Sequence, residues 1–152
     1  MTKMPDLRSH VIFELGNSIK YIGPVPKTSV EALAKSLAVW FKRYEFHKDR
    51  PAMTLYQSMT DYELCGLCDL YFYFDDEDVP HCDKDETLCP IAQDGHLFCH
   101  DSNYTRYCEN KNAETALAEY RYLVKLARKY CPDVKWVDWH DSECTYPVPV
   151  EA

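Results

Sequence analysis

The feature that most constrains this chain is a cysteine-rich stretch without a regular hydrophobic period. Six of the eight cysteines and three of the six histidines lie between residues 65 and 108. Residues 75–110 contain many carboxylates and turn residues but no sustained helical or strand repeat. A long irregular segment is unusual inside a compact domain, because its peptide groups lack a hydrogen-bonded ladder. We therefore expect bonds to the clustered thiols to hold this part of the chain.

The cysteine spacing favours a structural zinc site. Cys65 and Cys68 form a C-x2-C pair, which is the short chelating unit of many such sites. A tetrahedral zinc ion takes four thiolate or imidazole ligands, so a second pair must come from later in the chain. We expect Zn²⁺ to be bound by Cys65, Cys68, Cys89 and Cys99, with Cys82 as the main competitor for a place. The next candidates are His81, His96 and His100.

Other uses of the cysteines stay open. A redox C-x2-C belongs at a helix N-terminus in a βαβ unit, and the chain shows no such alternation. An iron–sulfur cluster also uses four thiolates, and two metal ions are an alternative to one. Burial as a small core residue suits Cys131 and Cys108. A disulfide framework would need an oxidising compartment, but the first 23 residues lack the continuous apolar core of a signal peptide.

Two amphipathic helices are predicted, over residues 28–47 and 112–131. Thr28 begins the first with a capping box to Glu31, and an apolar stripe from Val30 to Tyr44 follows. Its opposite side carries Glu31, Lys35, Lys42 and Arg43. Asn112 can cap the second helix, whose stripe runs from Ala116 to Ala127 before Pro132.

The predicted fold is mainly α, of the α+β type. A short hairpin is expected in residues 11–26, and a short strand or packed arm in the tail, 132–152. With no repeat and no linker, residues 1–152 read as a single domain. The two principal helices would surround an irregular, zinc-stapled segment, 62–108, with a small β element near the termini.

The net charge of −8 argues against a nucleic-acid partner for the surface as a whole. The one basic cluster, "KLARK" at 125–129, is typical of a solvated helix end. The acidic run at 75–86 lacks the spaced ligands and glycine of a calcium loop, and reads as a solvated loop or a docking surface for a basic partner. No stretch is apolar enough to span a membrane.

Five motifs in order resemble a group of small cysteine-rich proteins of tailed bacteriophages. They are "ALAKSLAVWF", "CGLCDLYFYF", "CDKDETLCPI", "CHDSNY" and "AETALAEYRYLVKLARKYC", together covering about residues 31–131. The resemblance implies metal binding by Cys65, Cys68, Cys82, Cys89 and Cys99, and a phage origin. This chain departs from the group in its C-x6-C middle pair, its added histidines and its extended ends. The group has no established activity.

These observations predict a non-catalytic, zinc-binding phage accessory protein in the cytoplasm of the host cell. Through its acidic surface it would bind and modulate or inhibit a host or phage protein, such as a component of a defence system. The alternatives are a metal-dependent nuclease or hydrolase using His81, His96 or His100, and a nucleic-acid-binding zinc module using Lys125, Arg128 and Lys129.

Overall fold

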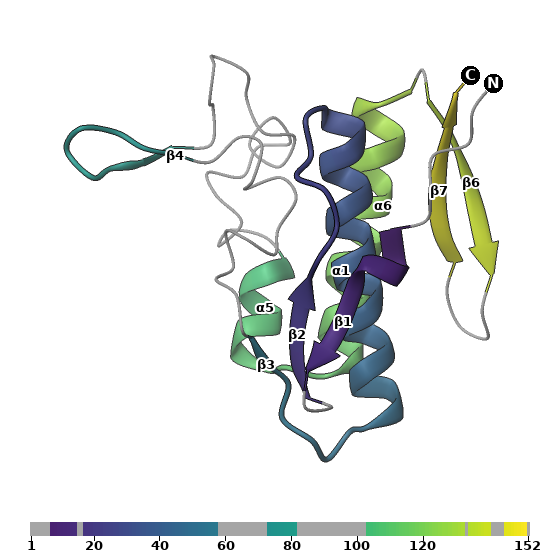
Figure 1. Ribbon diagram of the computed structural model, residues 1–152. Coiled ribbons are helices and arrows are strands. Elements are labelled where there is room, and N and C mark those ends of the chain that lie inside the picture. Colours follow the sequence, from purple (N-terminus) through teal and green to yellow (C-terminus); the bar gives the residue numbers. More distant parts are fainter. Residues whose placement is uncertain are drawn as a thin grey trace.

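The computed structural model describes residues 7–14, 17–57, 73–81, 103–132, 134–140 and 145–151. Its main body is a pair of long helices, α1 (Ser29–Asp49) and α6 (Ala113–Tyr130), which pack side by side (Figure 1). The short helix α5 (Asn103–Glu109) packs on α6, and the 3-10 turn η1 (Leu7–His10) packs on α1. The fold is therefore mainly α with a small β element, as the sequence predicts.

The strands among the described residues form three small sheets. The first has the order β1-β2-β3, with β1 and β2 antiparallel and β2 and β3 parallel. The other two sheets are antiparallel hairpins, β4–β5 and β6–β7. The bounds are β1 Val11–Glu14, β2 Ser18–Tyr21, β3 Tyr56–Gln57, β4 Tyr73–Phe74, β5 Pro80–His81, β6 Val134–His140 and β7 Thr145–Glu151.

Both long helices begin at the predicted caps. The Thr28 hydroxyl accepts a hydrogen bond from the Glu31 backbone N–H at 3.2 Å. The Asn112 side chain accepts one from the Thr115 N–H at 3.0 Å, and the Thr115 hydroxyl accepts one from the Asn112 N–H, which completes a capping box. Each cap satisfies amide groups that lack partners within the helix, so local sequence determines where these helices start.

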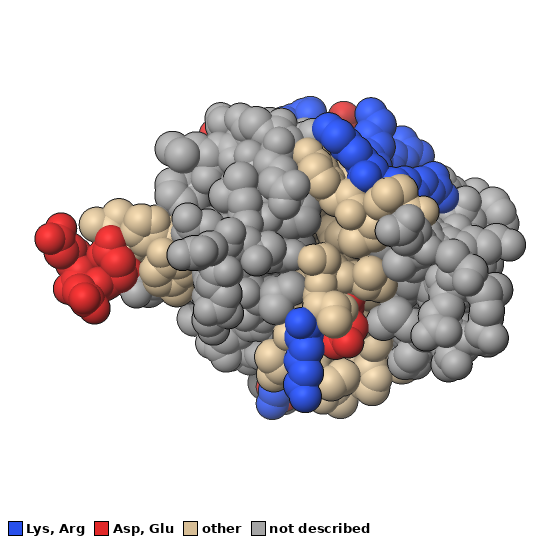
Figure 2. Space-filling model, turned by 90° about the horizontal axis from the view of Figure 1, so that it is seen from above, with Lys and Arg blue, Asp and Glu red and all other residues tan. Residues whose placement is uncertain are grey.

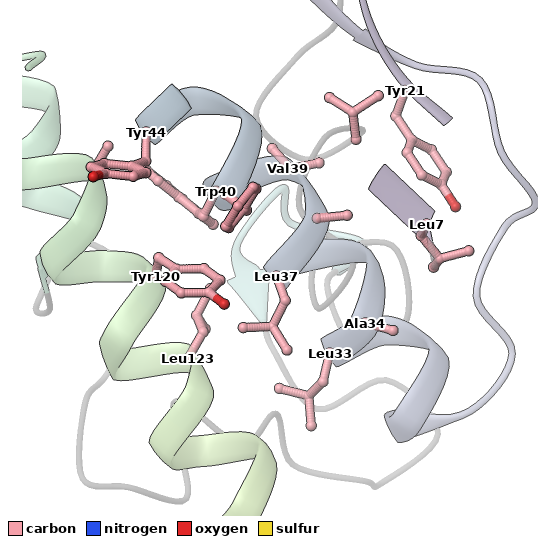
Figure 3. Close-up of a cluster of buried hydrophobic side chains, with 14 of the residues drawn as sticks. Leu7, Tyr21, Leu33, Ala34, Leu37, Val39, Trp40, Tyr44, Tyr120 and Leu123 are labelled. Carbon is pink, nitrogen blue, oxygen red and sulfur yellow. The ribbon is translucent and has the colours of Figure 1, made fainter. Parts of the chain in front are cut away.

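The core lies around α1. Figure 3 shows Leu33 and Leu37 on the side of α1 that faces Tyr120 and Leu123 of α6. On another side, α1 is covered by η1, which carries Leu7, and by β1, and Ile19 and Tyr21 of β2 belong to the same buried cluster. The core thus joins residues from both ends of the chain. Among the described residues, its largest fully buried aliphatic side chains are Ile19, Leu33, Leu37, Leu123 and Leu126.

The prediction that one side of the first helix is polar and faces away from the core is partly wrong. Lys35 and Arg43 are only 2% and 3% exposed. The Lys35 ammonium lies 4.4 Å from the centroid of the Tyr21 ring, and the Arg43 guanidinium lies 4.3 Å from that of Trp40. Aromatic faces attract such cations, so β2 and α1 itself supply surroundings in which the two charges are tolerated.

The cysteine-rich segment is more regular than the sequence indicates. Its end forms α5, and residues 73–81 form the β4–β5 hairpin. The rest of 62–108 lies outside the described residues, so its predicted zinc staple does too. In the tail, β6 and β7 pair as a hairpin over seven residues each, where the sequence predicts a single strand or an arm.

Candidate functional site

The β4–β5 hairpin projects from the rest of the described structure (Figure 1). Tyr73 of β4 pairs with His81 of β5, and Phe74 pairs with Pro80. Between the two strands lies the loop "DDEDV", residues 75–79, and its first four residues are carboxylates. We refer to residues 73–81 as the acidic hairpin. Its tip carries one of the densest runs of negative charge in the sequence.

Asp75 organises this loop. Its backbone N–H donates to the Val79 carbonyl at 3.0 Å, and its own carbonyl accepts from the Asp78 N–H at 3.0 Å. Its side-chain Oδ1 accepts from the N–H groups of Glu77 and Val79, each at 2.9 Å. Asp78 has a φ of 60°, a left-handed conformation that Asp tolerates better than most residues. Aspartates therefore supply the turn chemistry that glycine more often provides.

The other carboxylate oxygen of Asp75 reaches across the hairpin. Oδ2 lies 2.8 Å from Nε2 of His81. The imidazole in turn stacks on the Tyr73 ring, with centroids 5.0 Å apart and planes inclined by 18°. The hydrogen bond from His81, together with those from the Val79 and Glu77 amides, lowers the pKa of the Asp75 carboxyl. Asp75 is therefore a fixed, ionised group at the base of the loop.

The remaining carboxylates face solvent. Asp76, Glu77 and Asp78 are all exposed. Figure 2 shows acidic side chains gathered on the projecting end of the molecule, whereas Lys and Arg side chains gather on the body. The exposed basic residues of α6 include Arg121, Lys125, Arg128 and Lys129. Among the described residues, the hairpin tip thus concentrates exposed negative charge, and α6 carries a group of exposed basic side chains.

All but one of the predicted metal ligands lie outside the residues that the structure describes. Cys65, Cys68, Cys82, Cys89, Cys99, His96 and His100 all lie outside them. His81 is placed in the acidic hairpin. Within the described ranges, no group of three or more His, Cys, Asp or Glu side chains could hold a metal ion.

The two described cysteines lie in different settings. Cys108 is exposed on α5, and Cys131 is buried at the end of α6. Burial raises the pKa of the Cys131 thiol, because a low-polarity environment disfavours the thiolate. Cys131 therefore agrees with the alternative prediction of a small core residue, whereas the exposed Cys108 does not.

The structure contains a buried polar cluster between α1 and α5 that no sequence motif indicates. His47 Nε2 and the Tyr107 hydroxyl lie 2.8 Å apart, although 60 residues separate them. Arg43 lies over the rings of Trp40 and Tyr107, at 4.3 and 5.5 Å from the centroids. Burial, and then the nearby charges of Arg43 and Lys111, lower the pKa of His47. The cluster is enclosed in the core, so we assign it a structural role.

No protein-family model, characterised protein or solved structure matches this chain. None of the described helices is long and apolar enough to cross a membrane. Function therefore has to be argued from the acidic hairpin and from the cysteine pattern.

Proposed function

We propose that the protein is a non-catalytic binding protein that presents its acidic hairpin to a basic surface of a partner protein. The observation that carries this proposal is the projecting tip on which Asp76, Glu77 and Asp78 are all exposed. Carboxylates concentrated on a protruding element attract a positively charged surface and orient it during the encounter.

The internal bonds of the hairpin support such a role. Because Asp75 fixes both the turn and His81, the tip keeps its shape before binding, so less conformational freedom is lost in the complex. Tyr73 and Val79 are 36% and 45% exposed on the same hairpin. They offer apolar contact area beside the charges, a combination typical of protein interfaces.

We further propose that Zn²⁺ holds the cysteine-rich segment that carries this hairpin. The hairpin lies in the sequence between the C-x2-C pair, Cys65 and Cys68, and the later cysteines, Cys82, Cys89 and Cys99. These five thiols exceed the four ligands of a closed tetrahedral site, and a closed site leaves no position for a reactive water. Metal-binding energy would then contribute to folding.

The resemblance to small phage proteins supports a proposal for where the protein acts and for its partner. A phage accessory protein acts in the cytoplasm of an infected bacterium, so the partner would be a host protein whose activity the complex modulates or inhibits. A partner that normally binds nucleic acid would have the basic surface that an acidic hairpin can occupy.

A charge-matched comparison tests the binding proposal. One variant carries Asp76→Asn, Glu77→Gln and Asp78→Asn, and the control removes three exposed carboxylates elsewhere, with Asp49→Asn, Glu109→Gln and Glu114→Gln. Immobilised wild-type protein and both variants are exposed to bacterial lysate, and captured proteins are identified and then measured as purified pairs. We expect the hairpin variant to lose a basic partner that the control retains. Equal binding by both variants, or no partner for the wild type, would refute the role of the hairpin.

A further inference from the structure

We propose that the outer edge of β6, the edge that does not pair with β7, is an interaction surface for a second copy of this chain. The two β6 strands would lie antiparallel across a two-fold axis and join two β6–β7 hairpins into one four-stranded sheet. The inference goes beyond the proposed function, because it uses neither the acidic hairpin nor the metal ion. The backbone of β6 and two prolines of β7 carry it.

The prolines of β7 indicate which backbone groups of the hairpin point outward. Pro147 lies opposite Asp138, and Pro149 lies opposite Trp136. In an antiparallel pair, opposite residues alternate between pairs that exchange two N–H···O=C bonds and pairs that exchange none. Proline has no N–H to exchange, so these two pairs fit the positions without hydrogen bonds. The N–H and C=O groups of Trp136 and Asp138 therefore point away from β7.

The two edges of the β6–β7 hairpin consequently differ in what they can bind. Two outward positions of β7 are Pro147 and Pro149, which lack the N–H group that a neighbouring strand needs. Proline at such positions is one way in which proteins protect a sheet edge from pairing. On β6, each outward residue keeps both an N–H and a C=O group. These residues are Val134, Trp136, Asp138 and His140. The edge of β6 is therefore the one that can accept another strand.

The β6–β7 hairpin is a long two-stranded ribbon. Its strands have seven residues each and are paired in register along their whole length. β7 contacts α1, and β6 contacts α6, the helix that precedes it. Among the residues that the structure describes, no third strand pairs with β6 or β7. A two-stranded ribbon is only marginally stable unless further strands or other elements pack on it, so a strand added at β6 would stabilise the sheet.

A second copy fits this edge because the edge is complementary to itself. Val137 is the middle residue of β6. With a two-fold axis at Val137, position 136 of one copy lies opposite position 138 of the other, and position 134 lies opposite position 140. Each outward N–H then meets an outward C=O of the other copy. An axis at any other residue of β6 would leave part of this row unpaired.

Charge supports the same register. With the axis at Val137, Lys135 lies opposite Trp139, and no two residues of like charge are opposite each other. An axis at Asp138 would place that residue opposite its own copy, and like charges at opposite positions destabilise a sheet. The order of residues in β6 therefore favours the register that also pairs the whole row of outward backbone groups.

Dimerisation at β6 is compatible with the proposed function. Figure 1 shows the β6–β7 hairpin and the acidic hairpin on opposite sides of the two long helices. A dimer would present two acidic hairpins, and a partner with two basic sites would bind it more tightly than it binds one chain. The net charge of −8 makes two copies repel each other, so added salt should strengthen their association by screening this repulsion.

Analytical ultracentrifugation of the full-length protein over a range of concentrations tests the proposal with two variants of one residue. Asp138→Pro removes an outward N–H and none of the hydrogen bonds within the hairpin, whereas Asp138→Asn removes the same charge and keeps the N–H. We expect the wild type and Asp138→Asn to dimerise with similar affinity. Asp138→Pro should dimerise at least about ten-fold more weakly, since each copy loses one hydrogen bond. A monomeric wild-type protein, or equal dimerisation of the two variants, overturns the inference.

A second readout uses the wild-type chain alone, so it does not depend on the folding of a variant. Amide hydrogen exchange is followed by NMR at low and at high protein concentration. The amides of Lys135 and Val137 point toward β7 in this register and should be protected at both concentrations. Those of Trp136 and Asp138 should exchange freely in the monomer and become protected in the dimer. A dimer in which these two amides stay unprotected overturns the inference and leaves the proposed function standing.

Discussion

The buried contact between His47 and Tyr107 predicts a measurable loss of stability when one hydroxyl group is removed. Tyr107→Phe deletes the oxygen that lies 2.8 Å from His47 Nε2 and leaves the ring in place. The edge-to-face contact with Trp40 and the contact with Arg43 both involve the ring, so the variant preserves them. Any loss in this variant therefore reports on the hydrogen bonding of the Tyr107 hydroxyl.

The magnitude follows from burial. Tyr107 and His47 are 3% and 5% exposed, so water cannot readily replace the lost partner. A buried polar group left without a hydrogen bond costs about 1–3 kcal/mol. In a domain of this size, each kcal/mol corresponds to a decrease in Tm of about 2–4 °C. We expect α5 to be the element most affected, since Tyr107 joins it to α1.

Urea denaturation followed by circular dichroism measures this loss. The matched control is Tyr56→Phe, because Tyr56 is 58% exposed and its hydroxyl should be replaced by water at a cost within about 0.5 kcal/mol. Combining Tyr107→Phe with His47→Leu removes both polar partners, so the double variant should lose less than the sum of the single variants. Equal stability of the Tyr107 and Tyr56 variants, or strict additivity in the pair, would refute this account of the contact.

Three further outcomes are expected. Because the pKa of His47 is lowered in the folded protein, the unfolded chain binds the imidazole proton more tightly, so the free energy of unfolding should fall as the pH drops below the usual histidine pKa of 6.5, by at most about 1.4 kcal/mol per pH unit. In urea titrations, His47→Gln should remove this part of the pH dependence, and an unchanged profile would contradict the prediction. Asp78→Gly and Asp78→Val remove the same charge, but only Val is strained in the left-handed conformation of residue 78. Cross-strand NMR contacts of the hairpin should therefore persist in the Gly variant and weaken in the Val variant, and identical spectra would argue against this turn. Leu37→Ala, at a fully buried position facing α6, should cost about 2–5 kcal/mol in chemical denaturation, whereas Val25→Ala, at a residue 67% exposed, should stay within about 0.5 kcal/mol; similar losses would place the core elsewhere.

The sequence predicts the parts of the fold that local signals control. The caps Thr28 and Asn112 each precede a helical hydrophobic stripe, so both long helices were expected within two residues of their observed ends. The N-terminal hairpin follows from short apolar runs on either side of a turn. Hydrophobic periodicity and capping residues alone therefore predict the mainly α architecture with a small β element.

Contacts between residues far apart in the chain could not be predicted from these local signals. Lys35 and Arg43 occupy the side of the helical period opposite the apolar stripe, yet the Tyr21 and Tyr107 rings cover them from other elements. The partner of His47 lies 60 residues later in the chain. Such burial depends on how elements pack, which a single helix pattern does not contain.

The sequence of the acidic hairpin contains a local signal for its turn. An aspartate at the start of a turn often binds the amides that follow it, and Asp75 does so twice. The choice among the cysteines had no such signal, because five thiols compete for four places and spacing alone does not rank them.

The central claim is that zinc bound by the clustered cysteines holds the segment that carries the acidic hairpin. Elemental analysis of the purified protein, combined with a count of reactive thiols before and after chelation, tests it most directly. The account predicts at least one zinc ion per chain and an increase in reactive thiols when the metal is removed. A metal-free protein whose eight cysteines all react at once, or are joined in disulfides, would contradict it.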